Sequence, residues 1–230
     1  MDVDTQCVIL AGGLATRLRP ITDNIPKSMV RIADKPFLEY QIELLKKVGV
    51  QNIVLCVGHK SEMIRDYFGD GTKYNIRINY SYEDKLLGTG GALRNAIGML
   101  KDHFYVLYGD AYLNINYQNI EKYFRDNKSL ALLTVYRNEG RLDTSNVTFI
   151  DDKFVLYDKQ NPSKEMQLID YGLSILSKSV VIKYIPKNTF YDLAHCYNRL
   201  SKKNQLLGYE VKERFYEIGS KSGLEEFKEF

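Results

Sequence analysis

A short apolar strand that runs into a glycine-rich, cation-bearing loop near the N-terminus is the feature that most constrains this chain. The stretch VILAGGLATRLRPITDNIPKSM starts with apolar residues at 8–10, continues into Gly12 and Gly13, and carries Arg17 and Lys27. A buried strand that ends in a glycine loop leaves backbone N–H groups free to meet an anion. Cations on both sides of the loop favour a large, highly charged anion. A nucleoside triphosphate fits this description.

The loop differs from the two commonest phosphate-binding motifs. It has neither the GxxxxGK[ST] spacing of a P-loop nor the GxGxxG spacing of a dinucleotide-binding turn. The missing GxGxxG, together with the Pro-Lys pair that follows the loop, disfavours a simple NAD-binding domain. The order of two glycines, an arginine and a Pro-Lys pair is more specific than a glycine pair alone.

The first half of the chain alternates strand-like and helix-like segments. Apolar patterning predicts strands at 6–10, 52–57, 76–83 and 104–108, and helices at 37–48, 61–68 and 89–100. This rhythm predicts an α/β fold, a Rossmann-like and mostly parallel sheet flanked by helices. Ligands of such sheets bind beyond the carboxyl ends of the strands. The glycine loop and the Gly109-Asp110 pair both follow strands and are therefore expected at that edge.

The second half is richer in strands. Strands are expected at 130–136, 146–150, 154–157, 168–176, 206–211 and 215–218, and helices at 191–203 and 224–230. No internal repeat or long linker interrupts the pattern, and 230 residues suit one sizeable domain. We expect a single domain over residues 1–230, with a first part of about 1–115 and a second part of about 116–230.

Composition excludes several classes of function. The formal net charge of +3 is too small to suggest a nucleic-acid footprint, so any positive field must be local. The three cysteines are widely spaced, which predicts buried free thiols in a reducing compartment and argues against a zinc site. No signal peptide or membrane span is apparent, so a cytoplasmic protein without membrane partners is expected.

The N-terminal string resembles the signature of the sugar-1-phosphate nucleotidyltransferases, the nucleotide-sugar pyrophosphorylases. LGTGGAL at 87–93 resembles the base-binding loop of the same family, in the form that is most similar to guanylyltransferases of D-glycero-D-manno-heptose or mannose 1-phosphate. The resemblance implies the joining of a nucleoside triphosphate, here GTP, to a sugar 1-phosphate, with release of pyrophosphate. It further implies Mg²⁺ as cofactor, a role in polysaccharide synthesis and a possible homo-oligomer.

The resemblance also assigns catalytic and metal-binding residues. Arg17 corresponds to the arginine that grips the β- and γ-phosphates, and Lys27 to the lysine that reaches the α-phosphate. Asp110 corresponds to the magnesium aspartate. Glu217 stands where the family usually carries a second metal-binding aspartate, two residues before a glycine. This substitution departs from the common pattern, because glutamate is one methylene longer.

The remaining expected contacts are with the nucleotide and the sugar phosphate. Nucleotide-binding residues are expected at Leu10, Ala11, Gly12, Gly13, Thr16, Arg17, Glu83, Leu87, Gly88, Thr89, Gly90 and Gly109. Sugar-phosphate contacts are expected at Lys159, Asp170 and Gly172. Lys159 lies where the family often has Glu-Lys-Pro, although here an aspartate precedes it and no proline follows.

Two other interpretations stay open. One is a uridylyl-, thymidylyl- or cytidylyltransferase of the same fold. The other is a non-catalytic regulatory protein that binds sugar nucleotides; such relatives usually lose the arginine, lysine or aspartate that this chain retains. Arg19 reads equally well as a structural ion-pair partner. The three histidines, His59, His103 and His195, match no motif and are expected to be structural.

Overall fold

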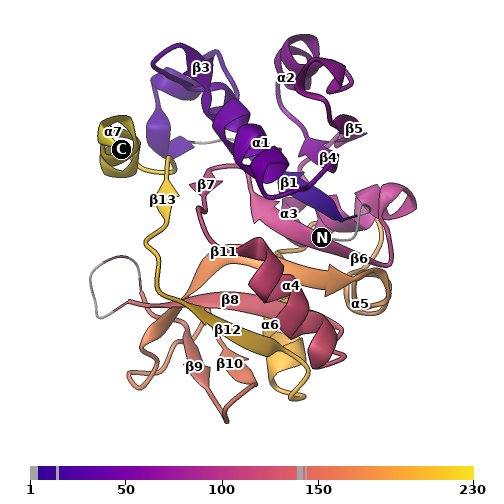
Figure 1. The fold of residues 1–230 in the computed structure, drawn as a ribbon, viewed down its shortest axis with the longest axis vertical. Coiled ribbons are helices and arrows are strands. Elements are labelled where there is room, and N and C mark those ends of the chain that lie inside the picture. Colours follow the sequence, from indigo (N-terminus) through magenta and orange to yellow (C-terminus); the bar gives the residue numbers. More distant parts are fainter. Residues whose placement is uncertain (1–4, 14–15, 139–141, 143) are drawn as a thin grey trace.

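The computed structural model describes residues 5–13, 16–138, 142 and 144–230 (Figure 1). Its centre is a nine-stranded sheet in the order β10-β9-β11-β6-β1-β4-β5, with β8 paired to β11 and β12 paired to β8. The strands of this sheet are β1 (Gln6–Leu10), β4 (Asn52–Val57), β5 (Arg77–Tyr82), β6 (His103–Tyr108), β8 (Ala131–Arg137), β9 (Val147–Phe149), β10 (Val155–Tyr157), β11 (Leu168–Ser177) and β12 (Leu207–Val211).

The first-half strands form a parallel unit with β1 near its middle. β1 pairs in parallel with β4 on one side and with β6 on the other, and β4 pairs in parallel with β5. The chain therefore runs outward from β1 to β5 and then returns to the opposite side of β1. Such a reversal leaves a crevice between the ends of the two strands that flank it. Here that crevice opens where Leu10 of β1 lies beside Tyr108 of β6.

The second-half strands make the sheet mixed. β11 runs antiparallel to β6 and β8 and touches β9, and its pairing with β8 shifts register between Asp170 and Ser174. The predicted fold class, a Rossmann-like sheet flanked by helices, is confirmed. The sheet is less parallel than expected, because β11 joins the two halves in the antiparallel direction.

Helices cover both faces of the sheet. They are α1 (Phe37–Lys47), α2 (Ser61–Phe68), α3 (Gly88–Asn95), α4 (Tyr117–Asp126), α5 (Lys178–Tyr184), α6 (Leu193–Ser201) and α7 (Lys221–Glu229). One buried cluster joins α1, α2 and α4 to the sheet, and a second joins α3, α5 and α6 to the opposite face. The fold thus has three layers with a core on each side of the sheet.

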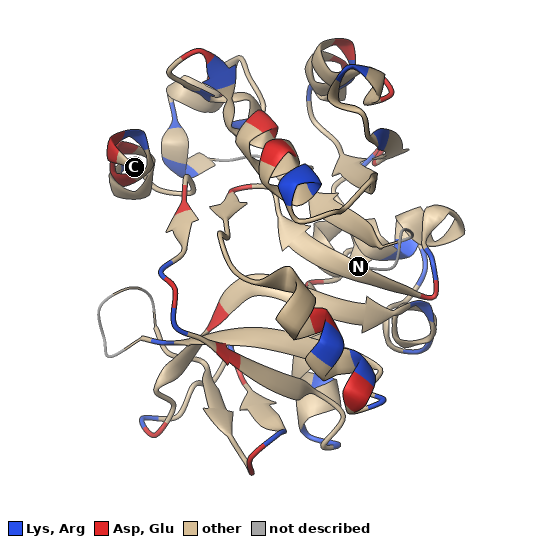
Figure 2. Ribbon diagram, viewed as in Figure 1, with Lys and Arg blue, Asp and Glu red and all other residues tan. Residues whose placement is uncertain are grey.

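The central strands are apolar on both faces because both faces are covered. In β1, Cys7 and Ile9 belong to one cluster and Val8 to the other, and all three are fully buried. In Figure 2 the charged residues lie on the helices and loops, whereas the central strands are almost free of them. The cysteines Cys7, Cys56 and Cys196 are buried free thiols, as predicted.

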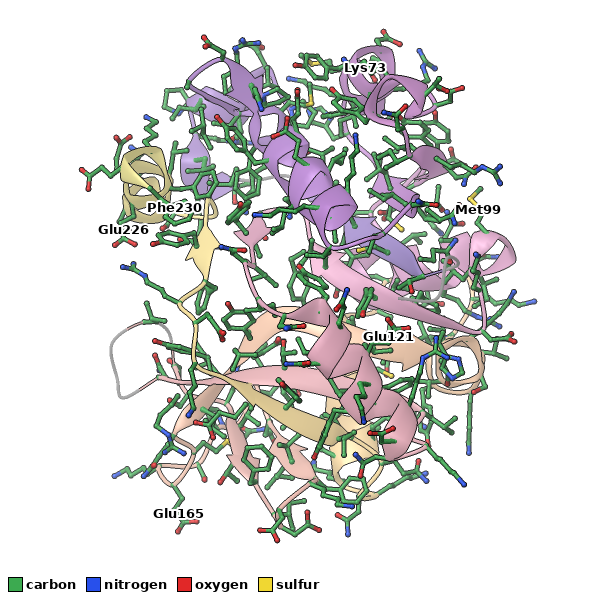
Figure 3. The ribbon with its side chains drawn as sticks, viewed as in Figure 1. Lys73, Met99, Glu121, Glu165, Glu226 and Phe230 are labelled. Carbon is green, nitrogen blue, oxygen red and sulfur yellow. The ribbon has the colours of Figure 1, made fainter. Side chains whose placement is uncertain are left out.

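A third, smaller cluster holds the C-terminal helix against the N-terminal region. Leu224 and Phe227 of α7 pack with Leu18 and Phe37. Phe230, labelled in Figure 3, contacts Tyr216 with ring centroids 4.4 Å apart. Two short ladders complete this region, β2 (Arg31–Ile32) with β3 (Lys35–Pro36) and β7 (Ala111–Tyr112) with β13 (Tyr216–Glu217).

Most predicted elements are present, with shifted ends. The helix expected at 191–203 begins only at Leu193, because Asp192 is its N-cap and accepts a hydrogen bond from Ala194 N. α4 and α5 were not predicted from the sequence. Among the described residues, no helix has the length and apolar character needed to cross a membrane.

Candidate functional site

The glycine loop begins where β1 ends, and close backbone packing explains one of its glycines. Ala11 N donates to Cys56 O at 2.9 Å, which anchors the start of the loop on β4. A Cβ on Gly12 would lie 2.6 Å from Glu83 Oε1. The backbone at Gly12 therefore lies close to the Glu83 carboxylate, and a larger side chain at this position would require the carboxylate to move.

The turn after β6 lies directly beside this loop. Gly109 N donates to Leu10 O at 3.0 Å, and a Cβ on Gly109 would come within 2.8 Å of the same oxygen. Gly109 thus permits the β6 turn to touch the end of β1. Asp110 follows at the tip, and Lys27 Nζ donates to Asp110 Oδ2 at 2.6 Å.

Lys27 reaches Asp110 from a short 3₁₀ helix, Lys27–Met29, which follows the extended residue Pro26. The two side chains are partly buried, with 19% of the Lys27 side chain and 27% of the Asp110 side chain exposed. The sequence places these residues 83 positions apart, and the reversal of strand order around β1 brings them together.

A second group of charged side chains gathers around Gly219. Glu217 pairs with Ala111 in the β13–β7 ladder, and Ile218 N donates to Asp110 O at 2.9 Å. A Cβ on Gly219 would lie 2.5 Å from Glu217 Oε2, 3.0 Å from Asp110 Oδ2 and 3.1 Å from Arg17 Nη2. The two carboxylates and the guanidinium therefore lie close to one another.

The Glu217 carboxylate is held by its own loop. Its Oε1 accepts from Ser220 Oγ at 2.5 Å, and its Oε2 accepts from Gly219 N. A carboxylate oxygen has two lone pairs, so these bonds leave acceptor capacity on Glu217. Its role as a metal ligand stays a prediction.

Asp110 and Glu217 are the residues that could hold a metal ion. Within the described ranges, no three or more His, Cys, Asp or Glu side chains gather in a way that could do so. Two hard carboxylate oxygens beside a phosphate site nevertheless match the way Mg²⁺ is commonly bound, with one or two carboxylates and substrate phosphates.

The LGTGGAL segment forms the start of α3, and its glycines pack against the segment at 189–193. Gly90 N and Gly91 N both donate to Tyr191 O, at 2.9 and 3.1 Å. A Cβ on Gly88, which has φ of +72°, would lie 2.9 Å from the same oxygen. Close packing of two backbone segments thus accounts for these glycines, in addition to any contact with a base.

Thr89 is engaged by the same neighbouring segment. Its Oγ1 donates to Asp192 Oδ1 at 3.1 Å and accepts from Leu193 N at 2.8 Å. Because Asp192 also caps α6, one hydrogen-bond network ties the start of α3 to the start of α6.

A cleft of about 220 Å³ lies where these segments meet. Its lining includes many of the predicted residues: Leu10, Ala11, Gly12, Gly13, Lys27, Glu83, Gly88, Thr89, Gly109 and Asp110. Four further lining residues were not predicted: Ser28, Leu86, Ala92 and Tyr108. Each is next to or inside a predicted motif, which is the only signal the sequence offered for them.

Other predicted nucleotide contacts lie outside the lining of this cleft. Leu87 and Gly90 are buried, and Leu87 N donates to Glu83 Oε2 at 2.9 Å. Thr16 and Arg17 are exposed on the segment after the glycine loop. Arg19, on the same segment, pairs with Asp23 at 3.3 Å.

Glu83 and Asp110 are the two carboxylates among the residues that line the cleft. Burial raises the pKa of Glu83, and the hydrogen bond from Leu87 N opposes this rise. A half-buried carboxylate can accept hydrogen bonds from a ligand that presents N–H groups.

Of the predicted sugar-phosphate residues, Gly172 lies close to Tyr108 and is hydrogen-bonded to Asp170. Gly172 has φ of +99°, and a Cβ on it would lie 3.6 Å from both Tyr108 Cδ2 and Ala111 Cβ. Its N–H donates to Asp170 Oδ1 at 2.9 Å. Burial raises the pKa of Asp170 to about 6, opposed by this hydrogen bond and by the charge of Lys159. These three residues are absent from the lining of the cleft that the described residues form.

The chain is similar in sequence to known proteins. The family model described as "Nucleotidyl transferase" matches residues 6–145. The chain is 37% identical over 175 residues to the D-glycero-alpha-D-manno-heptose 1-phosphate guanylyltransferase of Campylobacter jejuni, covering 76% of this chain and 77% of that protein. It is 34% identical to the UTP--glucose-1-phosphate uridylyltransferase of a Synechocystis strain, covering 82% of this chain and 53% of that protein.

The fold is also similar to that of solved structures. HddC from Yersinia pseudotuberculosis, crystallised with GMP-PN, superposes with a TM-score of 0.80 at 28% identity, covering 98% of this chain and 99% of that chain. A glucose-1-phosphate thymidylyltransferase-like protein from Bacillus anthracis has a TM-score of 0.84 at 19% identity, covering 98% of this chain and 94% of that chain, which supports the fold alone.

Proposed function

Since this chain belongs to the nucleotidyl transferase family and is a nucleotidyltransferase, we propose that it joins GTP to a heptose- or mannose-type sugar 1-phosphate with release of pyrophosphate. The family resemblance that the motifs indicated is confirmed. The choice of GTP is supported by the guanylyltransferase relative and by HddC, whose crystals contained GMP-PN. We propose that residues 1–230 act as one domain, with a nucleotide-binding part of about 1–115 and a sugar-phosphate-binding part of about 116–230.

The observation that carries the proposal is the cleft between the ends of β1 and β6. It brings a glycine loop, a lysine and a carboxylate into contact at the edge where open α/β sheets bind ligands. Gly12 and Gly13 would let the triphosphate approach the loop backbone. Lys27 lines the same cleft, within reach of an α-phosphate bound there.

The reaction needs positioning more than acid–base chemistry. An oxygen of the sugar phosphate attacks the α-phosphorus, the new P–O bond forms, and the bond to the β-phosphate bridging oxygen breaks as pyrophosphate leaves. The nucleophile is already an anion, so the enzyme must hold two anions together and neutralise charge. We assign Lys27 to the α-phosphate and Arg17 to the departing β- and γ-phosphates.

The carboxylates fit a magnesium ion. Asp110 Oδ2 and Glu217 Oε2 lie beside the same point near Gly219, and both offer hard oxygen donors. We propose that these two residues hold Mg²⁺, which when bound would neutralise phosphate charge and orient the phosphates. Lys27 keeps the Asp110 carboxylate aimed at the cleft by direct pairing.

Glu83 supports the choice of guanine over the other bases. The Watson–Crick edge of guanine carries two adjacent N–H donors, at N1 and N2, which one carboxylate can accept together. Uracil and thymine offer a single N–H donor on that edge. Glu83 Oε1 lies against Gly12 at the base of the cleft, where it can meet such an edge.

The test is a matrix of substrates. The purified protein is incubated with Mg²⁺, with each of GTP, ATP, UTP, dTTP and CTP, and with a panel of sugar 1-phosphates, and pyrophosphate release is measured. GTP with a heptose or mannose 1-phosphate is expected to give the highest kcat/KM. A clear preference for UTP would favour the uridylyltransferase alternative, and no turnover with any pair would favour the regulatory one.

A matched pair of variants tests the role of Glu83. Glu83→Gln keeps the shape but removes one acceptor, so kcat/KM for GTP should fall by roughly 10- to 100-fold relative to UTP, a loss of about 1.4–2.8 kcal/mol. Asp84→Asn changes the adjacent exposed carboxylate and should leave the ratio unchanged. An unchanged GTP-to-UTP ratio in Glu83→Gln would remove Glu83 from base selection.

A further inference from the structure

Gln41 is a buried polar residue on the otherwise apolar inner face of α1. It is 1% exposed, and the other buried residues of this helix are Phe37, Leu38, Ile42, Leu44 and Leu45. A buried amide in an apolar core is costly unless its hydrogen bonds are made. In Gln41 the amide nitrogen makes the bonds, whereas Oε1 has no hydrogen-bond partner among the described residues. The hydrogen-bond partners of Gln41 therefore indicate its role.

The Gln41 amide nitrogen donates to two backbone carbonyls that bracket Asp110. Gln41 Nε2 lies 2.9 Å from Tyr108 O and 2.6 Å from Ala111 O. Tyr108 ends β6 and Ala111 begins β7, so the only residues between the two bonds are Gly109 and Asp110. One side chain thus holds both ends of the turn that carries the proposed magnesium aspartate.

The remaining backbone bonds of the turn come from other parts of the site. Gly109 N donates to Leu10 O, and Ile218 N donates to Asp110 O. The first bond ties the turn to the glycine loop, and the second ties it to the strand that carries Glu217. Gln41 supplies the support from the third side, behind the cleft.

The same helix also supports the other partner of Asp110. α1 packs against the 3₁₀ helix Lys27–Met29. Phe37 N, at the start of α1, donates to Val30 O at 2.9 Å, and Tyr40 Oη donates to Ile32 O at 2.8 Å. α1 therefore supports both the segment that carries Lys27 and the turn that carries Asp110.

We propose that Gln41 is a positioning residue that fixes the direction of the Asp110 carboxylate toward Lys27 and the metal position. This inference rests on the proposed function, in which Asp110 holds Mg²⁺. A purely structural glutamine would contribute to the free energy of unfolding but would leave the folded site unchanged. A positioning glutamine must alter metal affinity and kcat in protein that is fully folded.

The experiment measures Mn²⁺ binding by the fall in the electron paramagnetic resonance signal of free Mn²⁺, with a non-hydrolysable GTP analogue present. Gln41→Met keeps the side-chain length and removes both donated hydrogen bonds. Residues that orient metal ligands typically contribute 10- to 100-fold to affinity or activity. We therefore expect Mn²⁺ affinity and kcat each to fall by roughly tenfold or more. The KM for the nucleotide should change by less than about threefold.

Ile42→Val is the matched control, because it weakens packing on the same buried face and leaves the two hydrogen bonds of Gln41 in place. It should leave Mn²⁺ affinity unchanged even where it lowers the melting temperature. Gln41→Glu serves if Gln41→Met fails to fold, since a carboxyl group has the same shape but donates one hydrogen bond when protonated and none when ionised. It should shift affinity and kcat in the same direction. Wild-type Mn²⁺ affinity and kcat in a folded Gln41 variant would overturn the proposal.

A cycle with Asp110→Asn separates this inference from the proposed function. If Gln41 acts through Asp110, Gln41→Met should add little to the loss already caused by Asp110→Asn. Additive losses would show that Gln41 acts elsewhere. If Asp110→Asn alone leaves Mn²⁺ affinity at the wild-type level, the metal assignment fails and the positioning role fails with it.

Discussion

Lys27 Nζ lies 2.6 Å from Asp110 Oδ2, so the cation that follows the glycine loop pairs directly with the carboxylate after β6. The pair links the segment after the glycine loop to the turn after β6, on the two sides of the reversal of strand order. It means that the lysine assigned to the α-phosphate and the aspartate assigned to the metal ion belong to one electrostatic unit. A substitution of either residue must therefore change the electrostatic environment of the other.

Replacement of Lys27 by methionine should lower kcat/KM by about 10²–10³, because removal of a charge aimed at the reacting phosphate costs on this scale. It also leaves the Asp110 carboxylate without its nearest cation. Initial rates of pyrophosphate release over a range of GTP concentrations check this prediction. Lys35→Met is the control, since Lys35 forms an equally short but exposed pair with Glu43 at 2.6 Å. Activity of Lys27→Met within threefold of wild type would contradict the assigned role.

Arg17 and Arg19 are close in sequence but differ in environment. Arg17 Nη2 lies beside Asp110 and Glu217 near Gly219, whereas Arg19 pairs with Asp23 in an exposed i,i+4 bridge. Arg17→Ala should lower kcat by about 10² or more, since the departing pyrophosphate loses its guanidinium partner. Its melting temperature should barely change, because the side chain is exposed.

Arg19→Ala is expected to retain activity within about twofold, because exposed ion pairs contribute little. The two variants should be assayed side by side with the same substrates, and their thermal unfolding compared. Equal losses in both would mean that general loop charge, rather than the position of Arg17, drives the reaction.

The Asp192–Thr89 bond predicts that a residue outside the cleft controls nucleotide binding. Asp192→Ala removes both the α6 cap and the acceptor for Thr89 Oγ1. Loss of such a cap costs about 1 kcal/mol of stability. Because Asp192 also holds Thr89, which lines the cleft, the KM for GTP should rise by roughly fivefold. The KM for the sugar 1-phosphate should change less.

Asn116→Ala is the matched control for this prediction. Asn116 caps α4 by accepting from Asn119 N at 3.0 Å, and α4 packs on the face of the sheet opposite α3. Its loss should cost similar stability with no change in the KM for GTP. Parallel kinetic and melting measurements distinguish the two, and a common rise in KM would argue against a specific link through Thr89.

The sequence predicted the parts of the site that are carried by local motifs. The glycine loop and Asp110 each follow a strand, and the topology rule for open sheets places such residues at one edge. Lys27 was predicted from the motif, because it follows Pro26 in the N-terminal string. The role of Gln41 could not be predicted from the sequence, because a single glutamine in an amphipathic helix does not indicate which backbone groups it will bind. The hydroxyl of Thr89 was assigned to the nucleotide, yet its visible partners are Asp192 and Leu193, about a hundred residues away in sequence. Contacts of this kind depend on the tertiary fold.

The missed helix α5 has a different cause. Its sequence KSVVIKY contains three adjacent β-branched residues, which favour strands. The helix forms because Ser177 caps it, accepting from Val180 N, and because Val180, Val181 and Tyr184 are buried against the sheet. Tertiary burial here overrides local propensity.

Asp170 predicts a pH dependence of stability. Burial raises the pKa of this carboxyl from its usual 3.8 to about 6 in the folded protein. Between these pH values the folded state binds the proton more tightly than the unfolded state does. The free energy of unfolding should therefore fall as the pH rises from about 4 to above 6. The fall should be about 3 kcal/mol at most, because a tenfold difference in proton affinity corresponds to about 1.4 kcal/mol.

Asp170→Asn removes this cost and can still accept the hydrogen bond from Gly172 N. Urea unfolding at pH 4 and pH 8 should show the variant close to wild type at the lower pH and more stable at the higher pH. Asp151→Asn is a control of opposite sign, because hydrogen bonds from Phe154 N and Lys153 N lower the pKa of that exposed carboxyl. Asp151→Asn should bring no gain in stability at pH 8.

A stability difference between Asp170→Asn and wild type that is the same at both pH values would show that the buried charge is not its source. A stabilised variant whose KM for the sugar 1-phosphate rises would indicate that the charge is retained for binding, since a carboxylate accepts sugar hydroxyl hydrogen bonds more strongly than an amide oxygen does.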